Sequence, residues 1–358
     1  MTNDPKIPIE NIYYLFCYAW GRFDEAQSIG VGSDPSPDLP NLLAKVLLAG
    51  TRRLIRRGLD RSYQTITDDL PTVRGRIEFG GTLLLQARRA PRLTCEFDEL
   101  SRDVLHNQII KAVLGKLSKV DTLDRELGHE LRVLARRLAD VSEIHLNRSM
   151  FRRVQLHRNN AHYDLLLKVC ELTFLSLLPR TGDRYAFEEV VRDEVKMRAV
   201  FEEFVRNFYR LEQSHYSVKR LNIPWHGELI EGEGRLPLMK TDVFLESAKR
   251  RIIIDTKYYV RALQVSCGTE SFDSGNLYQL FAYLKNAHSL GPAYQTVEGL
   301  LLYPQVGNPL DATVKLQGHK LRFATIDLLQ PWEEIEGALL ALVGLPAKSS
   351  PPPFAFAA

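Results

Sequence analysis

Three ionisable side chains lie close together on two short apolar segments of the sequence. Asp242 stands near the start of segment 241–247, and Asp255 and Lys257 stand near the end of segment 250–259. Two carboxylates can bind a divalent cation, and an ammonium group beside them can neutralise charge on a phosphate under attack. The spacing therefore indicates metal-assisted phosphate chemistry, provided that folding brings the three groups together.

A tight β-hairpin would bring the two aspartates face to face. If the two segments pair in antiparallel fashion around Ala248 and Lys249, Asp242 lies directly opposite Asp255. Side chains in this relation have β-carbons about 4.5–5.5 Å apart, which is close enough for two carboxylates to share one cation. Because side chains alternate along a strand, Lys257 then emerges on the same face as Asp255.

Mg²⁺ is the cofactor that these groups favour. It prefers oxygen ligands in octahedral geometry and keeps several waters, so two carboxylates, a backbone carbonyl such as that of Thr256, and water would suit it. Lys257 could then orient or deprotonate a water molecule while the cation offsets charge on the phosphate. We therefore expect Asp242 and Asp255 as metal ligands and Lys257 as a catalytic residue.

The acid-x-Lys spacing by itself is common. It also occurs at Asp4–Lys6 and Glu194–Lys196, to which we assign no role. The third occurrence follows the apolar run Ile252–Ile254, which is typical of a buried strand, and two buried acids repel each other unless a cation or a proton intervenes. A register slip of one residue would turn Asp255 to the opposite face, so the spacing leaves a metal site and a chance match open.

A helix after the hairpin offers further polar side chains. The pattern of apolar residues predicts a helix at 274–284 that starts after Ser274 and carries Asn276, Gln279 and Tyr283 on one face. This face could bind a water, a phosphate or the lysine, and we expect Gln279 in a supporting catalytic role. An exposed polar stripe is the alternative.

Two glutamates on an earlier predicted helix are further candidate metal ligands. Glu202 and Glu203 lie at the margin of the apolar face of the helical segment 195–209. Either side chain could reach the metal. Ordinary surface glutamates are the alternative, and Glu202 stays a candidate ligand only.

Composition limits the class of protein. With 358 residues, 45% hydrophobic content and a net charge of +3, the chain is long enough for two domains but too weakly basic to indicate nucleic-acid binding by charge alone. The four cysteines lie far apart without a C-x-x-C spacing, so the sequence suggests neither a zinc knuckle nor a disulfide framework. The apolar stretch 12–20 is too short to span a bilayer, so we expect a cytoplasmic protein without a membrane contact.

The order of elements predicts an α/β (mixed α+β) protein with two domains. Helical patterns at 41–58, with Asn41 as its cap and Gly58 as its end, and at 101–140 flank a small sheet or hairpin at 72–83. We therefore expect a helix-rich N-terminal domain at 1–158. Helices and strands then alternate in a second domain at 159–348, and the Pro-rich tail 349–358 is expected to be disordered.

These residues resemble a known family. The hairpin with Asp242, Asp255 and Lys257, followed by the helix with Gln279 and Tyr283, is similar to the PD-(D/E)xK nuclease core. Seven blocks, in order, resemble the McrC family of nuclease subunits from 5-methylcytosine-specific restriction systems: IPIENIYYLFCYAW at 7–20, RGRIEF at 74–79, FDELSRDVLHNQIIK at 97–111, LPLMKTDV at 236–243, IIIDTKYY at 252–259, NLYQLFAYL at 276–284 and LLLYP at 300–304.

The resemblance implies a function and a partner. Proteins of the McrC family act with an McrB-like AAA+ GTPase, stimulate its GTP hydrolysis and cut both strands of double-stranded DNA carrying modified cytosine in the presence of Mg²⁺. The sequence has no G-x-x-x-x-G-K-[S/T] phosphate loop, so GTP would be bound by the partner. The family's N-terminal half docks in the partner's ring, a role that we assign to residues 1–158. Its candidate contacts are the arginine pairs at 52–53, 56–57, 136–137 and 152–153.

Two other functions stay open at this point. The chain could be a catalytically silent adaptor that activates a ring NTPase, or a stand-alone repair nuclease that cuts without a partner. The sequence identifies neither the modified base and its flanking motif nor the stoichiometry of the complex.

Overall fold

The computed structural model describes residues 7–22, 38–182, 184–188, 194–228, 230–231, 233–258, 263–266, 269–305 and 309–347. The chain forms two compact units, and each is described by itself. The sheet unit comprises residues 1–28, 32–39 and 189–358. The helical unit comprises residues 29–31 and 40–188.

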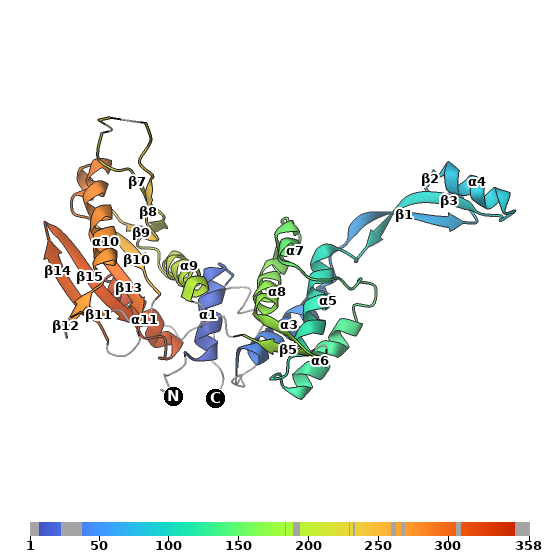
Figure 1. Cartoon of the computed structure of the whole chain (residues 1–358), viewed down its shortest axis with the longest axis horizontal. Coiled ribbons are helices and arrows are strands. Elements are labelled where there is room, and N and C mark those ends of the chain that lie inside the picture. The colour runs from blue at the N-terminus through green and yellow to red at the C-terminus, as the bar shows by residue number, and fades with distance from the viewer. Residues whose placement is uncertain are drawn as a thin grey trace. The chain divides into compact units, whose positions relative to one another are not determined.

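A six-stranded mixed sheet forms the centre of the sheet unit (Figure 1). Its strand order is β14-β15-β13-β10-β9-β6, in which β10, β13 and β15 run parallel and the other three strands join antiparallel. β10 and β13 are buried along almost their whole length, as expected for parallel strands covered on both faces. The strands are β6 (Ser217–Lys219), β9 (Val243–Glu246), β10 (Arg251–Thr256), β13 (Glu298–Pro304), β14 (Asp311–Leu316) and β15 (His319–Ile326).

Helices and short strand pairs complete this unit. The helices are α1 (Ile9–Ala19), α9 (Glu194–Glu212), α10 (Ser274–Ala287) and α11 (Trp332–Leu342), with the short turns η3 (His288–Leu290) and η4 (Pro292–Tyr294). The strand pairs are β7 (Asn222–Ile223) with β8 (Met239–Lys240), and β11 (Leu263–Ser266) with β12 (Thr269–Phe272). A mixed α/β fold with helices beside a mixed sheet was predicted and is confirmed.

Helix α10 packs closely on one face of the sheet. It begins at Ser274, and not after it, because Asp273 caps the helix by accepting a hydrogen bond of 2.8 Å from the Asn276 N–H. Leu280 of α10 belongs to the same core cluster as residues of β9, β10, β13 and β15. A β-carbon at Gly299 of β13 would lie 2.9 Å from the Leu280 side chain, so this approach of helix to strand requires glycine.

The N-terminal helix α1 folds with the sheet unit. The ring of Tyr18 stacks on that of Trp332 with centroids 5.4 Å apart, and its hydroxyl donates a hydrogen bond of 2.6 Å to Glu212. Asn207 of α9 donates from Nδ2 to the Tyr18 carbonyl at 2.9 Å. These contacts explain why the observed division differs from the predicted domains at 1–158 and 159–348.

The helical unit extends to residue 188 and combines helices with a small sheet. Its helices are α3 (Leu39–Arg57), α4 (Phe79–Ala87), α5 (Leu105–Leu117), α6 (Arg125–Arg136), α7 (Arg148–Arg153), η1 (Ala161–Tyr163) and α8 (Asp164–Ser176). Its strands are β1 (Ser62–Leu70), β2 (Arg76–Ile77) and β3 (Leu93–Ser101), in the order β1-β3-β2, and the pair β4 (Leu177–Arg180) with β5 (Arg184–Phe187). Figure 1 shows β1 and β3 side by side, with α4 near one end of the pair.

Helix α3 ends as predicted but begins differently. Gly58, with a φ of +96°, follows its last residue, Arg57. Asn41 is not the cap, because it lies inside α3 and its Oδ1 accepts a hydrogen bond of 3.0 Å from the Asp124 N–H. The asparagine therefore joins two helices.

The described cysteines are buried, and the C-terminal tail is not described. Cys17, Cys95 and Cys170 are buried free thiols, whereas Cys267 and the tail 349–358 lie outside the described residues. Within the part of the chain that the structure describes, no helix combines the length and apolarity needed to cross a bilayer.

Candidate metal centre

The register of the β9–β10 hairpin is the one that the sequence predicts. Arg251 pairs with Glu246, and the ladder continues to the pair of Ile254 with Val243. The Ser247 N–H donates a hydrogen bond of 2.9 Å to the Arg250 carbonyl, and this bond closes a two-residue turn. The next position of this register places Asp255 opposite Asp242.

Asp255 is a fully buried carboxylate paired with Lys257. Its exposed fraction is 0%, and its Oδ1 has no hydrogen-bonding partner. Lys257 Nζ lies 2.9 Å from Oδ2 and forms an ion pair with it. Burial raises the pKa of Asp255 to about 6, the charges of Asp242 and Glu202 add to the shift, and Lys257 opposes it.

Asp242 is held by the neighbouring strand. Its Oδ2 accepts a hydrogen bond of 2.8 Å from the Thr256 N–H and another of 2.9 Å from the Thr256 hydroxyl. The two bonds join the start of β9 to the end of β10, where Asp255 lies. The sequence did not indicate this role of Thr256, because alternation along the strand places its side chain on the face opposite to that of Asp255.

A β-bulge accompanies Asp242. Lys219 pairs with Phe244 in one ladder, and Asn222 pairs with Lys240 in the next. Residues 220 and 221 separate these pairs on one strand, whereas residues 241–243 separate them on the other. The strand that carries Asp242 therefore contains one extra residue. Bulges re-aim side chains and are frequent beside active sites.

A chain of hydrogen bonds orients Lys257. Its Nζ donates to Gln279 Oε1 at 2.9 Å, and Gln279 Nε2 donates to the Tyr283 hydroxyl at 2.7 Å. That hydroxyl donates in turn to the Lys240 carbonyl at 3.2 Å. Because a carbonyl can only accept, the direction of every bond is fixed, and the amide oxygen of Gln279 must face the lysine.

Asn276 does not share this arrangement. The sequence placed it on one face with Gln279 and Tyr283, but it is 5% exposed and its Nδ2 donates to the Tyr303 hydroxyl at 3.3 Å. A residue three positions before Gln279 lies on an adjoining part of the helix surface, which here packs on β13. The structure thus brings together Asp255, Lys257 and Gln279, with Asp242 beside them.

Glu202 lies close enough to interact with the aspartates. Burial raises its pKa, the charge of Asp242 adds to the shift, and Arg220 and Arg206 oppose it. Arg206 Nη1 lies 3.4 Å from Glu202 Oε1, and Arg220 Nη2 contacts the same oxygen. Glu202 is therefore already paired with two arginines.

The donor set fits a hard cation bound largely by water. Among the residues that the structure describes, no group of three or more His, Cys, Asp or Glu side chains could hold a metal. Two carboxylates remain, and the buried Oδ1 of Asp255 has no hydrogen-bond donor to satisfy it. Mg²⁺ is commonly bound by one or two carboxylates with water and phosphate, so Asp242 and Asp255 suit it.

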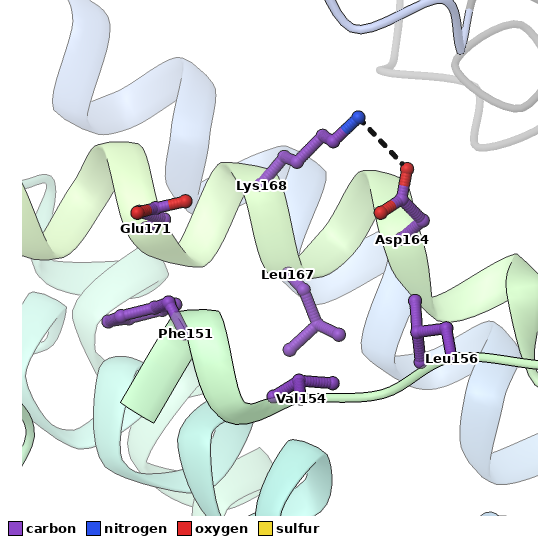
Figure 2. Close-up of a pocket in the computed structure, with 7 residues that line it drawn as sticks. All are labelled: Phe151, Val154, Leu156, Asp164, Leu167, Lys168 and Glu171. Atoms are coloured by element: carbon purple, nitrogen blue, oxygen red, sulfur yellow. Dashed lines mark ion pairs between the residues drawn. The ribbon is translucent and has the colours of Figure 1, made fainter. Parts of the chain in front are cut away.

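A separate pocket lies in the helical unit and contains none of these residues. Its volume is about 330 Å³. Figure 2 shows Phe151, Val154 and Leu167 at its apolar wall, and Lys168 paired with Asp164 at 3.0 Å. With Glu171 also lining it, the pocket mixes charges of both signs and indicates no particular ligand.

The sheet unit is thus a mixed α/β fold with two carboxylates and a lysine at the ends of paired strands. The family described as "McrBC 5-methylcytosine restriction system component" matches residues 11–304. A protein of Escherichia coli K12, named "Type IV methyl-directed restriction enzyme EcoKMcrBC", is 33% identical over 342 residues, which cover 94% of this chain and 97% of the relative. The chain belongs to this McrBC family.

A solved structure shares the fold. It is a chain from a half-complex of a tetradecameric assembly of Thermococcus gammatolerans McrB AAA+ hexamers with bound McrC. The TM-score is 0.57 at 15% identity, and the match covers 93% of this chain and 76% of that chain.

Proposed function

We propose that this chain is the Mg²⁺-dependent endonuclease subunit of a modification-dependent restriction complex that cleaves double-stranded DNA carrying modified cytosine. One observation carries the proposal: Asp255 is wholly buried, its Oδ1 has no hydrogen bond although Lys257 pairs with Oδ2, and Asp242 lies beside it. Burying a charge is costly unless a partner compensates it, so a carboxylate in this setting favours a cation.

Asp242 and Asp255 would hold the Mg²⁺ ion, and a backbone carbonyl such as that of Thr256 could add a ligand. When bound, the ion supplies Lewis acidity and offsets charge on the phosphate under attack. Thr256 fixes Asp242 through its N–H and its hydroxyl. The strand that carries one ligand therefore positions the other.

Lys257 acts beside the phosphate. Its side chain is 12% exposed, and its ammonium group is held between Asp255 and Gln279 at 2.9 Å from each. From this position it orients or activates the attacking water, or neutralises charge on the phosphate. Gln279 supports it by accepting one of its hydrogen bonds, and Tyr283 fixes the orientation of Gln279.

The sheet unit would then be a nuclease domain of the PD-(D/E)xK type. A hairpin that carries an acid on one strand and an acid-x-Lys motif on the next, followed by a helix with Gln279 and Tyr283, supports this assignment. Glu202 remains a candidate third ligand, because its carboxylate interacts with that of Asp242 across the site.

The helical unit would dock to an McrB-like AAA+ GTPase and stimulate its GTP hydrolysis. The arginine pairs named above lie in this unit on exposed positions of α3, α6 and α7 or directly after them, where an acidic partner surface could reach them. The T. gammatolerans assembly supports the partner class, since its McrC is bound to AAA+ hexamers. GTP would be bound by the partner, which would also read the modified base.

A cleavage assay with and without the GTPase partner and GTP tests this function. Methylated and unmethylated duplexes are incubated with the full chain in Mg²⁺ or in EDTA. We expect cutting only with partner, GTP, Mg²⁺ and the methylated duplex. Faster GTP turnover without cutting would instead indicate an adaptor, and cutting by the chain alone would indicate a stand-alone nuclease.

A further inference from the structure

Arg220 stands opposite Asp242 at the β-bulge. Leu221 N–H donates to the Thr241 hydroxyl at 3.0 Å, and Thr241 N–H donates to the Leu221 carbonyl at 3.0 Å. The ladder that pairs Asn222 with Lys240 therefore continues to these two residues. Arg220 and Asp242 are the next pair of neighbours in this register, and both interact with Glu202.

The ion pairs of Arg220 are shared with a second arginine. Its Nη2 contacts Glu202 Oε1 and lies 3.0 Å from Glu203 Oε1. Arg206 also pairs with both glutamates. The side chain of Arg206 is 10% exposed and that of Arg220 is 47% exposed. If Arg220 left, Glu202 and Glu203 would keep their buried partner, and exposed ion pairs contribute little stability.

Of the cationic side chains in these ion pairs, Arg220 is best placed to bind a further phosphate of the DNA strand. Two aspartates and two glutamates face three cationic side chains, of which Lys257 is occupied by Asp255 and Gln279 and Arg206 is buried. Arg220 is the most exposed of the three cations. Its planar guanidinium group can bind two phosphate oxygens at once, which makes arginine suited to phosphate recognition.

We propose that Arg220 is a substrate-binding residue that exchanges its ion pairs with Glu202 and Glu203 for a phosphate of the DNA strand held at Asp242 and Asp255. The inference rests on the proposed nuclease function and adds to it a specific contact with the substrate. The hydrogen bonds between Thr241 and Leu221 hold the backbone next to Asp242 and Arg220. Only the arginine side chain therefore needs to move.

The test is the salt dependence of DNA binding by the full chain. Anisotropy of a short labelled duplex is measured between 50 and 200 mM salt in Ca²⁺, which oxygen ligands also bind. Each phosphate contact contributes about 0.9 to the slope of log affinity against log salt. The factor by which affinity falls over this salt range should therefore be about threefold smaller for Arg220→Ala than for wild type. Arg220→Lys should keep the slope, because it keeps the charge.

The matched control is Arg102→Ala. Arg102 is similarly exposed, at 42%, and pairs with one carboxylate, Asp140, at 3.2 Å. It should keep the wild-type slope. If the Arg220→Ala variant keeps the wild-type slope, the inference is overturned, whether or not the variant still cleaves DNA. Arg220 would then have a structural role in holding Glu202.

The same preparations separate this inference from the function on which it rests. Cleavage by the wild-type chain with its partner, together with an unchanged Arg220→Ala slope, removes the inference alone. Absence of wild-type cleavage removes the nuclease function and the inference with it. Equal unfolding midpoints of the variants and the wild type would exclude misfolding as the cause of a reduced slope.

Discussion

Lys257 Nζ lies 2.9 Å from Oδ2 of Asp255, a carboxylate with no exposed surface. This ion pair balances one of the two negative charges that the hairpin brings together, and the second, on Asp242, is stabilised by Thr256. In the proposed function a bound cation would complete this site, because one lysine cannot balance both carboxylates and a DNA phosphate.

Replacing Lys257 by alanine should abolish most cleavage. We expect a loss of at least about 100-fold, the lower range for a positioned acid–base or charged group. Stimulation of GTP hydrolysis should be unchanged, because the proposed function assigns that activity to the helical unit. Cleavage and GTP turnover are measured on the same complex. Lys320→Ala, which removes an ion pair of 3.6 Å with Glu298, is the control and should cut normally.

Replacing Tyr283 by phenylalanine should release Gln279. Without the hydroxyl, the amide of Gln279 can rotate and present its NH₂ group to Lys257. The loss of one hydrogen bond of about 1.4 kcal/mol corresponds to about tenfold in the rate of cleavage, with DNA affinity unchanged. Tyr278→Phe on the same helix is the control, because Tyr278 is 69% exposed. Equal rates for the two variants would exclude the hydrogen-bond chain from catalysis.

The ion pair of Arg250 with Glu298 should make folding sensitive to acid. Two bonds of 2.7 and 2.9 Å join the side chains. Burial alone would raise the pKa of Glu298, but Arg250, with Lys320, outweighs it and holds the pKa below its usual value. A lowered carboxyl pKa stabilises the fold above the unfolded-state value near about 4.3, and this stability is lost as the pH falls through the folded-state pKa.

Glu298→Gln should therefore cost about 1–3 kcal/mol at pH 7. The difference from wild type should shrink as the pH falls through the folded-state pKa of Glu298, because protonated Glu298 is neutral, as glutamine is. Urea unfolding at a series of pH values measures it. A difference that stays constant across this range would mean that the charge of Glu298 contributes nothing.

Trp332→Ala should destabilise the sheet unit by about 3–5 kcal/mol. Trp332 is 5% exposed and packs on Tyr14 and Tyr18 of α1, so its loss opens the contact between the two ends of the chain. Trp225→Ala, at a position that is 43% exposed, should cost far less. Similar unfolding free energies for the two variants would show that α1 is not part of the sheet unit.

The hairpin could be predicted from local patterns of the sequence. The features that the sequence did not predict depend on packing between residues far apart in the chain. The register around Asp255 follows from a two-residue turn and strand alternation, both of which are readable within 20 residues. The packing of α1 on α9 joins Tyr18 to Asn207, which no local pattern encodes. The bulge at Asp242 depends on which strand pairs on its other side, so Arg220 could not be recognised as its neighbour.

The most direct test of the metal centre is cleavage of a methylated duplex by Asp255→Asn in complex with its GTPase partner, GTP and Mg²⁺. Asparagine keeps the size of the side chain, removes its charge and leaves Lys257 its hydrogen bond to Gln279, and equal unfolding midpoints of the variant and the wild type would exclude misfolding. We expect cleavage to be abolished while partner binding and GTP hydrolysis stay at wild-type levels. Cleavage at the wild-type rate would contradict the assignment of Asp255 as a metal ligand.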